Sequence, residues 1–190
     1  KASADNAISI GIDSLVSGAG SVAIGEANEV SGEASNALGS NNIIAQNNTF
    51  VVGNAVETTQ ANSVVLGNLS TDRAATSEST GTVGGITYGT FAGVGSADKG
   101  VVSVGAVGKE RQLINVAAGK VAADSTDAIN GSQLFATNVV IGKVANSTAT
   151  ILGGDAAVGT DGTLTMTNIG GTGEDTVHDA IKASFDQANS

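Results

Sequence analysis

Five copies of one short motif recur along the first third of the chain, and each copy ends in glycine. They read AISIG at 7–11, SVAIG at 21–25, SNALG at 35–39, TFVVG at 49–53 and SVVLG at 63–67. Their glycines are each 14 residues apart: Gly11, Gly25, Gly39, Gly53 and Gly67. A fixed period of this kind predicts a stacked solenoid. One period has room for about two five-residue strands and two tight turns.

When the repeats are aligned, each position of the motif becomes a column of similar residues. The second column is Ile8, Val22, Asn36, Phe50 and Val64, and the fourth is Ile10, Ile24, Leu38, Val52 and Leu66. Because alternate residues of a strand share a face, we expect these two columns to form an inner apolar ladder. The glycine that ends each motif fits a turn that needs a positive φ or a very close approach of two backbones.

The third column faces the other way, and it is small or apolar throughout: Ser9, Ala23, Ala37, Val51 and Val65. A strand that is apolar on both faces is usually covered on both. One coil of 14 residues is too thin to cover both faces, so we expect the third column to pack against another copy of the chain. The second strand of each coil is weaker. Its tenth column, Val16, Val30, Ile44, Thr58 and Asp72, loses its apolar character near residue 70.

The composition agrees with thin layers and excludes several classes of function. Glycine occurs 27 times in 190 residues, proline, cysteine and tryptophan never, and aromatic residues make up 3%. Small apolar side chains suit stacked repeats. With 18 acids against 8 bases, the net charge of −10 argues against binding to nucleic acid or to anionic membranes. Because the chain begins and ends abruptly, we expect it to be a segment of a longer protein.

Beyond residue 67 the repeat gives way to other patterns. It returns as VSVG at 102–105, which indicates an insertion of about 24 residues that carries Tyr88 and Phe91 as a small flap. Asp124, Ser125 and Thr126 are candidate helix caps. A heptad pattern with spacings of 4 and 3 then predicts a coiled coil through Leu134, Asn138, Ile141, Ala145, Thr148 and Leu152. Glycine-flanked β sequence interrupts it at 153–176, with TDG at 160–162 as a turn, and the heptad spacing resumes at Val177.

This order of motifs resembles the trimeric autotransporter adhesins, fibrous surface proteins of Gram-negative bacteria. The SVAIG repeats resemble the Yersinia-adhesin-type head, and residues 68–102 resemble its head insertion motif. VGKERQLINVAAGKVAADSTDAINGSQL is similar to the family's neck. LGGDAAVGTDGT…NIGG…VHDAI resembles its FGG insertion, with Leu152 where the family has Phe. The resemblance spans essentially the whole chain.

The resemblance implies a mixed fibrous fold: a left-handed parallel β-roll head, a neck and a trimeric coiled-coil stalk with a β insertion, in an intertwined homotrimer. The boundaries are a head at 1–67, an insertion at 68–102, the last roll strand and neck at 103–133, a coiled coil at 134–152, the FGG-like insertion at 153–176 and a resumed coiled coil at 177–190. In the neck, Arg111, Asn115, Asp127 and Asn130 match family positions and are expected near subunit contacts. The family's C-terminal outer-membrane anchor is absent from this sequence.

No residue pattern indicates catalysis, and no cofactor or metal is expected. The one histidine, His178, is expected to be exposed on a helix, and GTDGT and GTGED are turns rather than calcium loops. In a parallel trimer, three Asn138 side chains would meet on the axis. By the family's use of core asparagine they would hold a chloride ion, or they would set the register with water between them. Both readings stay open.

The leading hypothesis is a surface adhesin that attaches the bacterium to host extracellular matrix or to a cell-surface receptor. The alternative is a spacer segment of such a fibre with no ligand site of its own. A third class, an ice-binding or surface-array solenoid, needs a regular threonine column that the repeats lack. Residues 2–72 contain seven acids and no base, which serves either solubility or contact with a basic stretch of a matrix protein: Asp5, Asp13, Glu26, Glu29, Glu33, Glu57 and Asp72.

Overall fold

The computed structural model describes residues 1–190, which form two compact units. The first unit contains Lys1–Asn115 and Lys120–Thr126. The second contains Val116–Gly119 and Asp127–Ser190. Each unit is described below on its own.

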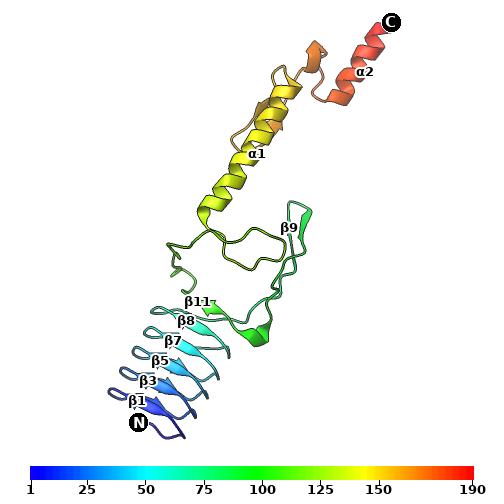
Figure 1. Ribbon diagram of the computed structural model, residues 1–190. Helices are drawn as coiled ribbons and strands as arrows, with labels where there is room; N and C mark the ends of the chain where they lie inside the picture. Colours follow the sequence, from blue (N-terminus) through cyan, green and yellow to red (C-terminus); the bar gives the residue numbers. More distant parts are fainter. The chain divides into compact units, whose positions relative to one another are not determined.

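The first unit is built around a roll of parallel strands stacked one coil above another (Figure 1). Its main sheet has the order β1-β3-β5-β7-β8-β11, with strands β1 (Ile8–Ile10), β3 (Val22–Ile24), β5 (Asn36–Leu38), β7 (Phe50–Val52), β8 (Val64–Leu66) and β11 (Val102–Ser103). A second sheet contains β2 (Leu15–Val16), β4 (Glu29–Val30) and β6 (Ile43–Ile44). Ile8 lies opposite Val22, and Val22 opposite Asn36, so the 14-residue period sets the register of the ladder.

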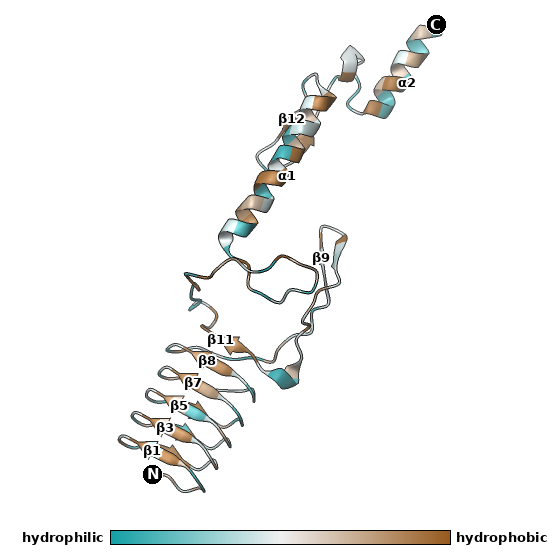
Figure 2. Cartoon of the chain, in the orientation of Figure 1, coloured by the Kyte–Doolittle hydropathy of each residue, from teal (hydrophilic) through white to brown (hydrophobic).

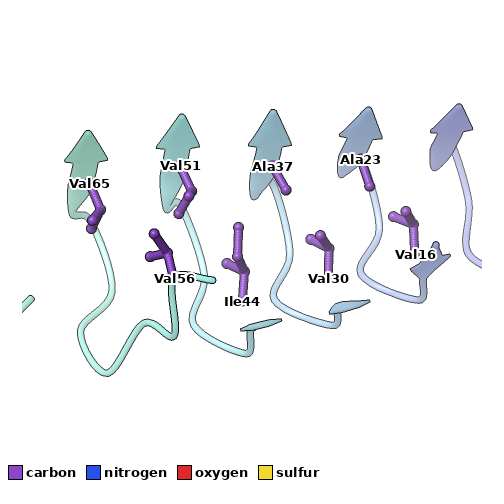
Figure 3. Close-up of a cluster of buried hydrophobic side chains, with 8 residues drawn as sticks. All are labelled: Val16, Ala23, Val30, Ala37, Ile44, Val51, Val56 and Val65. Atoms are coloured by element: carbon purple, nitrogen blue, oxygen red, sulfur yellow. The ribbon is translucent and has the colours of Figure 1, made fainter. Parts of the chain in front are cut away.

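The core of the roll lies between the two sheets, and it reverses the predicted orientation of the first sheet. The third column points inward, with Ala23, Val51 and Val65 0% exposed and Ala37 2%. The apolar members of the tenth column, Val16, Val30 and Ile44, meet it from the second sheet. Figure 3 shows these side chains alternating across the narrow interior: Val16, Ala23, Val30, Ala37, Ile44, Val51, Val56 and Val65.

The second and fourth columns, which we expected inside, therefore point outward. Ile10 is 56% exposed and Leu38 is 48% exposed. The physical reason is that the coil is thin. Its two strands are joined by tight turns, so a valine or isoleucine of the second sheet leaves room for only an alanine or valine from the first sheet. The third column, which we expected to meet another copy of the chain, instead fills this interior. Its small size was the signal for burial.

Polar ladders line both sides of this apolar core. The first column contributes Ser21, Ser35 and Thr49, and Ser21 Oγ donates to the carbonyl of Gly32 at 2.7 Å while accepting from the Ser35 N–H at 2.9 Å. The eighth column contributes the buried carboxamides of Asn28 and Asn42. These side chains form hydrogen bonds with backbone groups at the corners, where the chain leaves the sheet and no neighbouring strand can pair with it.

The turn after the first strand of a coil depends on the glycine that ends the motif. Gly25 has φ +129°, and a Cβ built on it would overlap the carbonyl oxygen of Gly39 in the next coil. Both reasons given for this glycine column are therefore confirmed at Gly25. The tenth column ends differently, since Thr58 is buried with no hydrogen-bond partner for its hydroxyl. Asp72 then accepts from the Thr59 and Gln60 N–H groups, so it closes the end of the second sheet.

The predicted insertion leaves the roll after β8 and returns to it at β11. Val102 lies opposite Val64, so the motif VSVG adds a further strand to the main sheet in the expected phase. Between them stand the antiparallel strands β9 (Thr80–Val83) and β10 (Ile86–Gly89) and the short 3₁₀ helix η1 (Ala97–Lys99). The Phe91 ring lies over Gly81, and Phe91 N–H donates to the Ser79 carbonyl at 2.8 Å. This is the small apolar contact of the flap.

The second unit consists of two helices and a small hairpin (Figure 1). Its elements are α1 (Gly131–Leu152), β12 (Ala157–Val158), β13 (Leu164–Thr165), the 3₁₀ helix η2 (Ile169–Gly171) and α2 (Val177–Ala188). The candidate caps at Asp124, Ser125 and Thr126 were wrong, because Asn130 caps α1. The turn at 160–162 is confirmed, since the Gly162 N–H donates to the Gly159 carbonyl at 2.9 Å.

Candidate functional site

The second and fourth columns form an outward face of the roll that is almost wholly apolar. We call it the apolar face. It has twelve residues, two from each strand level of the main sheet: Ile8, Val22, Asn36, Phe50, Val64 and Val102, with Ile10, Ile24, Leu38, Val52, Leu66 and Val104. None of the twelve carries a charge. A continuous apolar surface of this kind marks an interaction site.

The acidic side chains of the roll lie away from this face, at its corners and on the second sheet. Asp5, Asp13, Glu26, Glu29, Glu33 and Glu57 are all exposed, and none forms a salt bridge. Asp72 differs because its carboxylate accepts hydrogen bonds from Thr59 and Gln60. The structure therefore separates Asp72, which has a structural contact, from the other six acids, which face solvent.

Arg111 closes the last coil of the roll. Its guanidinium donates to the Asn68 carbonyl at 2.8 Å, the Val104 carbonyl at 2.8 Å and Ser70 Oγ at 2.9 Å. The group lies over Gly67, where a side chain would collide with it. One planar cation thus joins the segment just after β8, at Asn68 and Ser70, to Val104 where the chain has returned to the roll.

A groove of about 600 Å³ opens beside this contact, in the first unit. Valines from the returning strand form part of its wall, together with the charged residues Asp72, Arg73, Glu110 and Arg111. N–H groups of Glu110 and Gly108 lower the pKa of the Glu110 carboxyl. The groove has neither the histidine nor the cysteine that nucleophilic catalysis commonly uses with a base.

The other neck residues have separate local roles. Asn115 has a positive φ of 61°, which asparagine tolerates better than most residues. Asp127 lies against Gly119, with its Cβ 2.8 Å from where a Cβ on that glycine would stand. Asn130 Oδ1 accepts from the Ser132 N–H at 3.2 Å and its amide donates to the Val116 carbonyl at 3.0 Å.

Gln133 was missed from the sequence and completes the cap of α1. Its Oε1 accepts from the Asn130 and Gly119 N–H groups at 3.2 and 3.0 Å, and its amide donates to the Gly119 carbonyl at 2.7 Å. The spacing of Asn130 and Gln133 is that of a capping box, which was the available signal. The box ties the segment Val116–Gly119 to the start of the helix.

In the stalk region, the predicted heptad residues lie on an exposed helix. Leu134 is 59% and Ile141 is 60% exposed, and Asn138 is also exposed. His178 is exposed in the first turn of α2. In the hairpin loop, a hydrogen bond from Thr163 lowers the pKa of Asp161. At the open end of the hairpin, a hydrogen bond from Thr167 lowers the pKa of Asp155. The chain has no cluster of three or more residues suited to hold a metal ion.

Comparison with known proteins shows what this combination of elements is similar to. Residues 112–157, which include the capping box and α1, match the family model for the coiled stalk of trimeric autotransporter adhesins. The chain is 47% identical over 77 residues to the trimeric autotransporter adhesin AtaA of Acinetobacter sp. (strain Tol 5), and 48% identical over 71 residues to the autotransporter adhesin BtaE of Brucella suis. Along these stretches the chain is similar to the trimeric autotransporter adhesins.

These adhesins are much longer than the chain. The matches cover 40% of this chain but 2% of the Acinetobacter adhesin, and 37% of this chain but 10% of the Brucella adhesin. A solved structure, the C-terminal YadA-like domain of a Burkholderia pseudomallei protein, is similar to 73% of this chain with a TM-score of 0.53 and 32% identity. That match covers 63% of the Burkholderia chain. Its extent supports a YadA-like roll for this chain.

No helix of this chain is both long and apolar enough to cross a membrane.

Proposed function

We propose that this segment is part of a cell-surface adhesin fibre in which three copies of the chain associate through their apolar faces. The apolar face is the observation that carries the proposal, since twelve uncharged positions in two straight columns extend along the roll. Phe50 and Ile8 are close to half exposed on it. Burial of such a surface is favourable at roughly 25 cal/mol for each Å² removed from water.

Three copies suit this surface because it lies along only one side of the roll. A threefold axis parallel to the stack would bring three such faces together and leave the acidic corners in solvent. The relatives' names support the number three, as the Acinetobacter protein is called a trimeric autotransporter adhesin. The left-handed sense of the coil and the intertwining of the chains belong to the same proposal.

The neck and stalk would continue the trimer. Leu113 and Ile114 are more than 70% exposed in a single chain, and Leu134 and Ile141 are exposed on α1. We expect Arg111, Asn115, Asp127 and Asn130 to lie near the subunit contacts, in addition to their contacts within the chain. On the axis of the coiled coil, three Asn138 side chains would hold a chloride ion or ordered water.

In the full-length protein, a C-terminal anchor would fix the fibre to the bacterial outer membrane through type V secretion. The fibre would act in virulence by attaching the cell to a host matrix protein or a cell-surface receptor. Three copies of each contact allow the individual contact to be weak. The role is one of binding rather than catalysis, and neither nucleic acid nor a cofactor takes part.

The test is adhesion of the 1–190 trimer to a panel of matrix proteins and to cultured host cells. We expect saturable binding by the trimer. The matched control is Leu38→Asp, which places three carboxylates in the apolar face and should separate the chains, and its binding should fall by tenfold or more as avidity is lost. A correctly folded trimer that binds nothing would instead assign this segment the role of a spacer.

A further inference from the structure

One residue of the apolar face is polar. Asn36 stands at the start of β5, between Val22 in the coil before and Phe50 in the coil after, and the other eleven residues of the face are apolar. Figure 2 shows the result as a teal segment in β5, where the neighbouring strands are brown. Its backbone N–H donates to the Thr49 carbonyl, but its carboxamide has no hydrogen bond within the chain.

That carboxamide is compatible with burial only if it finds a polar partner. It offers two donors and an acceptor oxygen, and leaving them unpaired in an apolar contact is costly. The backbone groups of the adjoining strands are already used in the parallel ladder. Because the rest of the face is apolar, the one polar side chain that a second copy of this face can offer is its own Asn36.

Rotational symmetry supplies that partner. Around an axis parallel to the roll, each residue meets its copies at the same height along the axis. An asparagine side chain is self-complementary, so each of three can donate to the next and accept from the one before. We propose that Asn36 is the polar contact of the trimer face, where three Asn36 carboxamides form a closed hydrogen-bonded ring. This inference rests on the proposed trimer and assigns the second column to the side nearest the axis.

The ring would also distinguish the aligned trimer from a shifted one. Successive repeats are so alike that apolar residues alone would pack nearly as well after a shift of one coil. Such a shift places Asn36 of one chain against Val22 or Phe50 of the next, where its amide has no partner. A single polar residue in an apolar interface specifies alignment in this way in coiled coils, at some cost in stability.

The first test compares two charge substitutions in the 1–190 chain. Asn36→Asp would place three carboxylates together on the axis. The matched control is Asn41→Asp, at an exposed corner position. Asp13 occupies the same column in the first coil, with a similar positive φ. At pH 8 we expect the Asn36→Asp trimer to melt at least about 5 °C below the control. At pH 4 the gap should narrow, because like charges raise the pKa of neighbouring carboxyls. Equal melting of the two variants at pH 8 would overturn the ring.

The second test needs no charge and applies even if Asn36→Asp fails to fold. A trimer of Asn36→Val chains should melt at or above the wild type, since no amide is left without a partner. Mixed trimers, refolded from both chains and isolated by a tag on one of them, contain an incomplete ring and should melt below either pure trimer. Intermediate melting of the mixed trimers would refute the ring while leaving the trimer intact. A monomeric wild type, read from its mass, would refute the trimer itself.

Discussion

Asn42 donates a hydrogen bond through Nδ2 to Oδ1 of Asn28, at 2.9 Å, and the two residues stand one coil apart in the buried eighth column. The same Asn42 amide reaches the Gly53 carbonyl at 2.8 Å, and its Oδ1 accepts from the Val56 N–H at 3.1 Å. The side chain thus links the coil below it to the coil above. These buried links stabilise the corner, where the strand ladder is interrupted.

Replacing Asn42 with alanine should therefore destabilise the roll by about 2–4 kcal/mol, because three buried hydrogen bonds are lost and their partners stay buried. Urea unfolding followed by circular dichroism measures the change. The neighbouring Asn41→Ala is the control, since Asn41 is exposed and Ala27 and Ala55 occupy its column with the same positive φ. An Asn42→Ala chain as stable as Asn41→Ala would contradict the role of the ladder.

Gly25→Ala should prevent the third coil from stacking on the second. The new Cβ would overlap the Gly39 carbonyl, and φ of +129° disfavours a side chain independently. We expect a loss of about 3 kcal/mol or more. Gly20→Ala is the matched comparison, because nothing lies within 4 Å of its Cβ and Ala34 stands at the equivalent position. Thermal melting of both variants separates the effect of the overlap from that of the positive φ. Similar melting temperatures would show that the close approach of Gly39 does not cause the loss of stability.

Arg111→Ala should loosen the junction where the insertion leaves and rejoins the roll. Three hydrogen bonds disappear, and because the side chain is largely exposed we expect a local loss of only about 1 kcal/mol. Amide exchange near Ser70 and Val104 should become ~5-fold faster. Arg111→Lys should recover little, since an ammonium lacks the planar fork. Lys109→Ala is the control and should leave amide exchange unchanged. Wild-type exchange rates near Ser70 and Val104 in Arg111→Ala would contradict the role given to Arg111.

The open end of the hairpin in the second unit, where Asp155 precedes β12 and Thr167 follows β13, should weaken in acid. The hydroxyl and N–H of Thr167 donate to the Asp155 carboxylate and lower its pKa below the ordinary value of 3.8. A depressed pKa means that this contribution is complete above the unfolded value and is lost as pH falls through the folded one. Carboxyl NMR titration of Asp155 measures it directly. Thr167→Val should raise the pKa toward 3.8, and no change in that variant would rule out the assigned cause.

The sequence predicted the period, the parallel stacking and the returning strand at Val102, because glycine and apolar columns repeat in phase. It could not by itself orient the first sheet. Alternation shows that Ala23 and Ile24 face opposite sides, but not which side is inside, and both columns are apolar. The interior volume decided this, because the small alanine and valine side chains of the third column fit opposite the second sheet and the larger side chains of the fourth column do not. Two features of the sequence indicated burial: the small side chains of the third column and the 14-residue spacing of Asn28 and Asn42. Hydrophobicity alone reveals neither.

The functional residues were predicted with similar limits. The neck asparagine Asn130 was found, but its partner Gln133 and the cap they form were not, because the helix start was placed at Asp124–Thr126. Arg111 was expected near subunit contacts, and the structure adds three contacts within its own chain. The contact of Asn138 with its copies stays a prediction, because it forms only where three chains meet on an axis.

The molar mass of the folded 1–190 chain in solution tests the central claim most directly. Multi-angle light scattering on the eluting peak should give three times the 18.4 kDa of one chain, with strand and helix signals in the circular dichroism spectrum. Leu38→Asp should shift the mass downward by charging the apolar face. A stable folded species of 18.4 kDa from the wild-type chain would contradict the account, because the apolar face would then be exposed to water without a partner.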